Sequence, residues 1–216
     1  YFFICFFKII IIFNRKFKLK IFKIRNFYDY ITVRELFILE CYNLNQLKVH
    51  EDIKKFYSQI FIKNKFPLII DCGSNIGASP YYFYENYVNS KIVCLEPEIE
   101  NFKILQSNTK KNDFDLRHKA ISSSHYNFEI KKNSDDPRAF SAIYSSEGDV
   151  ESVTVNELLE KYNFQKYEPF LIKIDIEGGE KNLFEKNLEW IDKFKIIIIE
   201  PHDWMYPQKN LFQNFL

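Results

Sequence analysis

Glycine is scarce in this sequence. Only five glycines occur among 216 residues, whereas an average usage of about 7% corresponds to roughly 15. Four of them lie in two short clusters, Gly73 with Gly77 and Gly178 with Gly179. We expect these glycines to stand where no side chain fits.

Cysteine spacings typical of metal sites or of a disulfide framework are also lacking. Cys5, Cys41, Cys72 and Cys94 form no CxxC pair and show no metal-ligand spacing. We therefore expect reduced thiols, a cytoplasmic setting and no metal site.

No apolar run is long enough to span a bilayer, which takes about 20 residues. The run over residues 1–13 is broken by Lys8, and no small-residue cleavage site of a secretory signal follows it. The content of 46% hydrophobic and 27% charged residues excludes both a disordered chain and a multi-pass membrane protein.

The net charge of +1 gives no general case for a nucleic-acid-binding protein. The charge is uneven, however, because residues 1–25 are rich in lysine, arginine and aromatic residues and contain no acid. This segment is open to three interpretations: an ordinary extension, the remnant of a membrane anchor, or a segment that contacts a membrane surface.

The hydrophobic pattern predicts strands and helices in alternation from residue 50 onward. Short apolar runs over 67–71, 91–97, 170–176 and 195–200 read as buried strands. Helical spacing or capping predicts helices over 50–61, 78–88, 98–111 and 154–162, and another around Leu183 and Leu188. A strand over 114–122, an antiparallel excursion over 126–144 and a weak strand over 15–24 complete the pattern. It indicates an α/β fold with a mostly parallel sheet and helices on both faces, preceded by an N-terminal extension over 1–49.

Each of the four strong strands ends in an acidic residue. These residues are Asp71, Glu96, Asp175 and Glu200. Ligands of such sheets bind outside the carboxyl ends of the strands, so the acids mark one edge as the binding edge.

The first cluster of glycines follows the first of these strands, in the string from Asp71 to Gly77. Its spacing is neither G-x-G-x-x-G nor a P-loop, but it brings the backbone close to a ligand at a helix N-terminus. Glu96 follows 25 residues after Asp71, where an acid can accept hydrogen bonds from ribose hydroxyls. The alternative is a tight turn followed by a solvent-exposed glutamate.

The second glycine cluster lies in the string from Lys173 to Glu180. Asp175 is expected at the tip of its strand, and Glu180 in the first helical turn, where the helix dipole favours a carboxylate. A structural role explains Gly178 and Glu180. It does not explain an acidic pair beside a lysine in an apolar strand.

Four strings in this order resemble the FkbM family of S-adenosylmethionine-dependent methyltransferases. They are Asp-Cys-Gly-Ser-Asn-Ile-Gly from Asp71, Leu95-Glu96-Pro97, Lys-Ile-Asp-Ile-Glu-Gly-Gly-Glu from Lys173, and Ile199-Glu200-Pro201-His202. The resemblance spans residues 66–202 and implies a methyltransferase domain over 50–216. It implies the class I methyltransferase fold, with a seven-stranded sheet that binds S-adenosyl-L-methionine beyond its first two strands.

The resemblance also assigns site residues. It implies that the methionine part of the cofactor is lined by Asp71, Gly73, Asn75 and Gly77. Glu96 is expected to hold the ribose, and Ser122, with the two residues before it, to lie near the adenine. Only 14 residues follow His202, too few for the last helix and two strands of the fold, and the chain begins without Met. We therefore expect truncation at both ends.

The acceptor implied by the resemblance is a hydroxyl of a sugar, a glycan or a related small molecule. An Asp/Asn-Pro-Pro-aromatic string, used for base amino groups, is replaced by Asp175-Ile176-Glu177-Gly178. Asp175 and His202 are the candidate catalytic residues, with His202 as the base because a histidine pKa can lie near neutral. The alternative for His202 is an ordinary loop histidine.

Two other functions stay open from the residues. One is a non-catalytic remnant or binding module that keeps the sheet. The other is a nucleic-acid-directed enzyme that uses the basic segment as an arm, although the acidic remainder of the chain argues against a nucleic-acid partner.

Overall fold

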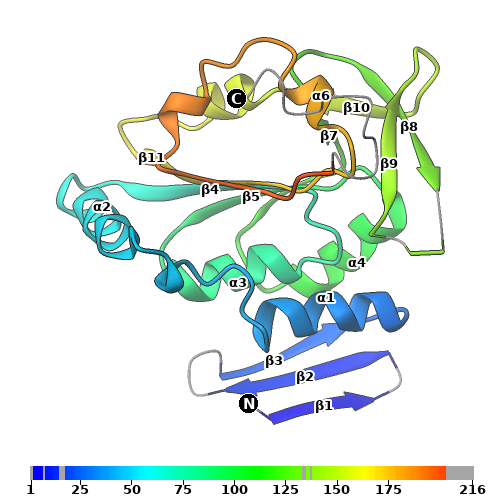
Figure 1. Ribbon diagram of the computed structural model, residues 1–216, viewed down its shortest axis with the longest axis horizontal. Helices are drawn as coiled ribbons and strands as arrows, with labels where there is room; N and C mark the ends of the chain where they lie inside the picture. The colour runs from blue at the N-terminus through cyan, green and yellow to red at the C-terminus, as the bar shows by residue number, and fades with distance from the viewer. Residues whose placement is uncertain (1, 7, 15–17, 133–134, 137, 203–216) are drawn as a thin grey trace.

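A computed structural model describes residues 2–6, 8–14, 18–132, 135–136 and 138–202. Its centre is a five-stranded parallel sheet in the order β12-β11-β4-β5-β6; Figure 1 labels β4, β5 and β11 of this sheet. The strands are β4 (Phe66–Cys72), β5 (Lys91–Leu95), β6 (Asp115–Arg117), β11 (Tyr167–Ile174) and β12 (Ile196–Ile199). The four expected strong strands are thus confirmed.

The apolar runs form strands because the sheet is covered on both faces. Alternate residues of β4 belong to two different cores: Ile69 packs with one buried cluster, and Leu68 and Ile70 pack with the other. The first cluster includes residues of α1 (Phe27–Phe37), α2 (His50–Ile62), α3 (Ala78–Asn86) and α4 (Ile99–Thr109). The second includes residues of α5 (Val155–Lys161) and Leu183 of α6 (Glu180–Leu183). Helices on both faces confirm the mixed α/β architecture.

Helix α6 is much shorter than the sequence pattern predicts. It ends at Leu183, and the prediction of one helix that also carries Leu188 is wrong. Asn187 takes a left-handed conformation with φ of 58° and donates from Nδ2 to the carbonyl oxygen of Ser123 at 2.8 Å. This turn, stabilised by a contact distant in sequence, interrupts the helical path before Leu188.

A separate four-stranded sheet has the order β7-β10-β8-β9. The antiparallel hairpin of β8 (Asn127–Lys132) and β9 (Phe140–Tyr144) confirms the expected excursion. The strand expected over 114–122 is instead divided between the two sheets, as β6 and β7 (Ala120–Ile121). Strand β10 (Val150–Val153) leads to α5, whose N-terminus has the expected capping box of Thr154 and Glu157.

The N-terminal segment forms an antiparallel sheet of β1 (Phe2–Phe6), β2 (Ile9–Asn14) and β3 (Lys18–Lys23), followed by α1 (Figure 1). Ile10 and Phe22 belong to the same buried cluster as Tyr81 of α3. The domain boundary between residues 49 and 50 stays a prediction, as does contact of the N-terminal segment with a membrane surface. None of the helices in the described residues has the length and apolar character needed to cross a membrane.

Two 3-10 turns complete the described elements, Leu44–Gln46 and Ile191–Lys193. The C-terminal segment on which the expected truncation depends, residues 203–216, lies outside the described residues.

Candidate active site

A cavity of about 650 Å³ opens at the carboxyl ends of β4, β5 and β11. This volume lies within the roughly 300–1,000 Å³ typical of small-molecule sites. Besides the strand ends, side chains from α1 and from the β8–β9 hairpin line it, among them Glu35 and Phe140. The sheet, the N-terminal segment and the hairpin therefore build one site together.

The glycine turn that follows β4 is held against the end of β11. Gly73 has φ of +82°, and a Cβ there would overlap the backbone oxygen of Asp175. Gly77 has φ of +88°, and its Cβ would lie 2.9 Å from Cδ1 of Leu105 on α4. Close packing within the protein thus requires glycine at these two positions, and the close approach of a ligand to this turn stays a prediction.

Asn75 and Glu96 meet at the floor of the cavity. The backbone N–H of Asn75 donates to Oε2 of Glu96 at 2.7 Å, and the N–H of Glu98 donates to Oε1 at 2.9 Å. Burial raises the pKa of Glu96 to about 7, although these backbone hydrogen bonds oppose the shift. Oδ1 of Asn75 is buried and has no hydrogen-bond partner among the residues that the structure describes. The floor therefore holds an acceptor that a ligand could satisfy.

Lys173 is a buried lysine between two strand-end carboxylates. Its Nζ lies 3.3 Å from Oδ1 of Asp71 and 3.2 Å from Oδ2 of Asp175, and it donates to the carbonyl oxygen of Gly73 at 2.7 Å. Burial by itself lowers the pKa of Lys173, but the carboxylates of Asp175 and Asp71 outweigh it and raise the pKa well above its usual value. Lys173 thus ties the glycine turn to both strands as a permanent cation.

Asp71 lies behind the cavity wall. Its Oδ2 accepts a hydrogen bond from Oγ of Ser79 at 2.6 Å, and the residue is fully buried. It acts on the site through Lys173 and Ser79, both of which line the cavity.

His202 is buried among carboxylates. Nδ1 lies 2.7 Å from Oε1 of Glu180, and Nε2 lies 3.4 Å from Oε2 of Glu177 and 3.8 Å from Oδ1 of Asp175. Burial by itself lowers the pKa of His202, but the hydrogen bonds with Glu177 and Glu180 outweigh it and raise the pKa to about 10. The expectation of a near-neutral pKa is therefore wrong, because the sequence did not show that these carboxylates surround the ring.

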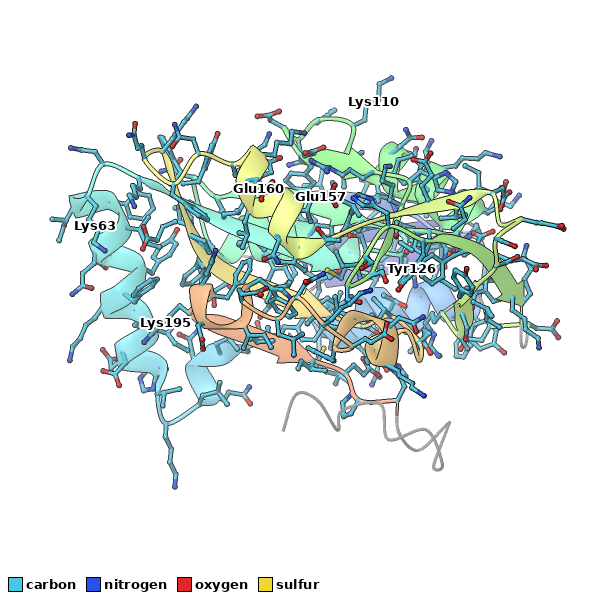
Figure 2. The ribbon with its side chains drawn as sticks, turned by 90° about the horizontal axis from the view of Figure 1, so that it is seen from above. Lys63, Lys110, Tyr126, Glu157, Glu160 and Lys195 are labelled. Atoms are coloured by element: carbon cyan, nitrogen blue, oxygen red, sulfur yellow. The ribbon has the colours of Figure 1, made fainter. Side chains whose placement is uncertain are left out.

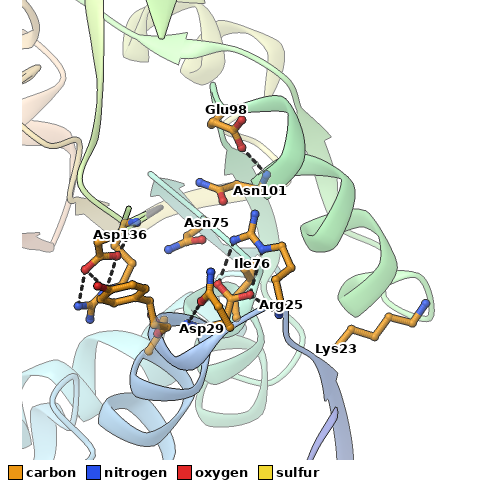
Figure 3. A network of polar contacts seen from close by, with 12 residues as sticks. Lys23, Arg25, Asp29, Asn75, Ile76, Glu98, Asn101 and Asp136 are labelled. Carbon is orange, nitrogen blue, oxygen red and sulfur yellow. Dashed lines mark hydrogen bonds and ion pairs between the residues drawn. The ribbon is translucent and has the colours of Figure 1, made fainter. Parts of the chain in front are cut away.

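Two local arginine–aspartate pairs brace the N-terminal segment and the β8–β9 hairpin, and the pair of Arg25 with Asp29 is drawn in Figure 3. Arg25 contacts the buried Asp29 through Nε and a terminal nitrogen at 3.0 and 2.9 Å. Arg138 makes a two-pronged contact with Asp136, and it also lies 3.8 Å from Glu35 of α1. The contact of Arg138 with Glu35 links the hairpin to α1, and both residues line the cavity.

The structure brings most of the predicted site residues together. Those that line the cavity are Gly73, Asn75, Glu96, Asp175 and His202. Asp71, Gly77 and Ser122 stand outside the lining, although Ala120 and Ile121, which precede Ser122, belong to it. The cofactor contacts assigned to these residues stay predictions.

Sequence reasoning missed several lining residues. They are Glu35, Tyr42, Ser79, Arg138 and Lys173. A charged residue in an otherwise apolar strand was the available signal for Lys173. No local pattern distinguishes Glu35 or Arg138, since each reaches the site only through the packing of a distant segment.

Comparison with solved structures finds the plantazolicin methyltransferase BpumL in complex with SAH. The two share 10% sequence identity with a TM-score of 0.32, and the match covers 85% of this chain and 65% of that chain. This chain thus spans about 65% of the length of that structure. No curated protein sequence matches it.

Comparison with family models identifies one domain family. The model described as the methyltransferase FkbM domain matches residues 71–216. The match begins at Asp71 and includes all the strand ends that form the cavity floor, in agreement with the resemblance of the four strings. The chain therefore belongs to the FkbM methyltransferase family.

Proposed function

We propose that this protein transfers a methyl group from S-adenosylmethionine, the cofactor of its family, to a hydroxyl group of a sugar or a related small molecule. The observation that carries the proposal is a single cavity lined by Asn75 and Glu96, which follow β4 and β5, and by Asp175 and His202, which follow β11 and β12. A cofactor and an acceptor can therefore meet in the same space.

The strand order supports a class I methyltransferase core. β4 is central, with β5 and β6 on one side and β11 and β12 on the other. This is the arrangement in which the first strand and its glycine turn face the cofactor and the next strand supplies a ribose-binding acid. In this proposal the domain over 50–216 is such a core, and its floor residues fit that cofactor.

The fit of S-adenosylmethionine to this cavity rests on the polar atoms of Asn75 and Glu96. A carboxylate offers about four acceptor positions, and Glu96 uses them for two backbone N–H groups and for Nδ2 of Asn101 at 3.4 Å. One position is left for a ribose hydroxyl, and Oδ1 of Asn75 offers another acceptor nearby. When bound, S-adenosylmethionine supplies a methyl group on a positively charged sulfur.

Asp175 is the proton acceptor in this proposal. A hydroxyl loses its proton as it attacks a methyl carbon, and a positioned base contributes about 10²–10⁴-fold to the rate. Lys173 holds Oδ2 of Asp175 at 3.2 Å, which leaves Oδ1 directed toward His202. Since His202 is held as an imidazolium, its role is to orient this carboxylate and to balance its charge.

The charge of the cavity favours an uncharged, hydroxyl-bearing acceptor over nucleic acid. Carboxylates outnumber lysines and arginines among the described lining residues. Arg138 is paired with Asp136, and Lys173 is paired with Asp71 and Asp175. A phosphate backbone would therefore meet net negative charge.

The test is transfer of a labelled methyl group into a panel of sugars, glycans and small hydroxylated metabolites, with amines and oligonucleotides alongside. We expect hydroxyl products. Asp175→Asn should lower kcat by about 10²–10⁴-fold, while Asp192→Asn, at an exposed position outside the cavity, should leave kcat unchanged. Products formed only from amines would refute the acceptor class. Cofactor binding without any transfer would favour the binding module.

A further inference from the structure

Three metal-binding side chains converge at the ends of two adjacent strands. Asp175 follows β11, and Glu200 and His202 follow β12, which pairs with β11 in parallel. One potential ligand atom from each of these three side chains lies within 4.8 Å of the others. Two ligands of one ion, each about 2.0–2.3 Å from it, are separated by roughly 3–4.6 Å, so small side-chain rotations suffice to bring all three onto a common ion.

The orientation of the His202 ring suits metal binding. Nδ1 contacts Oε1 of Glu180 at 2.7 Å, which leaves Nε2 directed toward Asp175 and Glu177. Histidines that bind metals usually donate their other ring N–H to a carboxylate in this way. Glu180 is fully buried, and its Oε2 has no hydrogen-bond partner within the described part of the chain. The supporting carboxylate is therefore in place behind the ring.

The cluster of Asp175, Glu200 and His202 carries more negative charge than the neighbouring lysines and arginines neutralise. Glu177 adds a further carboxylate 3.4 Å from Nε2 of His202. Lys173 contacts Oδ2 of Asp175 at 3.2 Å, and it is shared with Asp71. Oδ1 of Asp175 and the accessible carboxylate of Glu200 are thus left facing the cavity without a lysine or arginine of their own in the described residues.

We propose that Asp175, Glu200 and His202 bind a divalent cation at the acceptor end of the cavity. A site with one imidazole and two carboxylates suits Mn²⁺ or Zn²⁺ better than Mg²⁺, which prefers oxygen ligands. The ion takes the place of the proton on Nε2, so binding releases a proton. With the ion bound, His202 is neutral and Asp175 is a ligand, so the ion takes over the role that the proposed function gives to Asp175 in the ion-free site. It holds the acceptor hydroxyl and promotes loss of the hydroxyl proton to solvent or to a neighbouring carboxylate. This role rests on the proposed function, whereas binding of the ion does not.

The experiment measures Mn²⁺ binding to the purified full chain, without cofactor or acceptor, by calorimetry and by the loss of the free-ion electron paramagnetic resonance signal. We expect one ion per chain. Glu200→Gln is the main variant because Glu200 is exposed and its replacement should not disturb folding. It should weaken binding about tenfold or more. The matched control is Glu160→Gln on the surface of α5 (Figure 2), which should bind like the wild type.

A thermal readout checks the same site independently. A ligand that binds only the folded state raises the melting temperature, so Mn²⁺ should stabilise the wild type and Glu160→Gln but stabilise Glu200→Gln much less. No binding, or equal binding by all three proteins, would overturn the proposal. Methyl transfer that survives removal of the ion by a chelator would refute its role with the acceptor. A failure of methyl transfer altogether would leave the binding result standing.

Discussion

Lys173 and Asp71 are register partners on neighbouring strands, and their charged groups meet at 3.3 Å inside the protein. A buried lysine is tolerated only because carboxylates compensate it. The ion pair connects β11 to β4 at the point where both strands reach the cavity.

Lys173→Met should therefore destabilise the fold strongly. Removing one partner of a buried ion pair costs about 3–5 kcal/mol, because the carboxylate of Asp71 stays buried without its partner. Chemical denaturation measures the loss. The control is Lys103→Met, which removes an exposed pair with Glu100 on α4 and should change stability little. Equal effects of the two substitutions would contradict the importance of the buried pair.

Cofactor affinity should depend on pH through Glu96. Burial raises the pKa of Glu96 to about 7, and ribose hydroxyls donate to the ionised carboxylate, so binding favours the deprotonated form. Affinity should be full above pH 7 and fall by up to about tenfold per pH unit below it. Calorimetry with S-adenosylhomocysteine from pH 5 to 8 measures this.

Glu96→Gln provides the control for that dependence. It should bind more weakly at pH 8 and lose the dependence below pH 7. An unaltered slope in Glu96→Gln would assign the titration to another group. The same pKa shift acts on folding with the opposite sign: the folded state binds this proton more tightly than the unfolded state, so the contribution of Glu96 to stability decreases as the pH rises from about 4.5 to 7.

Gly73→Ala should unfold the site rather than merely fill it. The new Cβ would overlap the oxygen of Asp175 at a φ of +82°, and the left-handed conformation alone costs about 1–2 kcal/mol for a residue with a Cβ. Gly179→Ala is the comparison, since Gly179 has φ of −75° and its nearest side-chain atom would lie 3.2 Å from the new Cβ. Thermal denaturation should show a large loss for the first and a small one for the second. Full stability of Gly73→Ala with weaker cofactor binding would restore the ligand-approach explanation.

Phe22→Ala should reveal that the N-terminal sheet shares the core of the main domain. Phe22 is fully buried, with its ring 5.4 Å from that of Phe37 and 5.6 Å from that of Tyr81. Loss of such a side chain costs about 3–5 kcal/mol. Leu19→Ala, on the exposed face of β3, should stay within about 0.5 kcal/mol. A two-step denaturation curve, with only the first step shifted by Phe22→Ala, would instead indicate an independently folding extension.

The alternation of strands and helices was predictable because it depends on local periodicity. The runs over 67–70 and 170–172 are apolar throughout, as is typical of strands buried on both faces, and Thr154 with Glu157 signals a helix start within four residues. The short α6 was not predictable, because the turn at Asn187 depends on a contact with Ser123.

The sequence alone determined the binding edge, since parallel strands that each end in an acid must place Asp71, Glu96, Asp175 and Glu200 on one side of the sheet. Only the tertiary structure decided what these residues can do. It buried Asp71 behind Lys173, surrounded His202 with Glu177 and Glu180, and brought α1 to the cavity rim. The physical reason is that the position of each strand and the residue at its end follow from local patterns, whereas a charge state depends on burial and on neighbours that are distant in the chain.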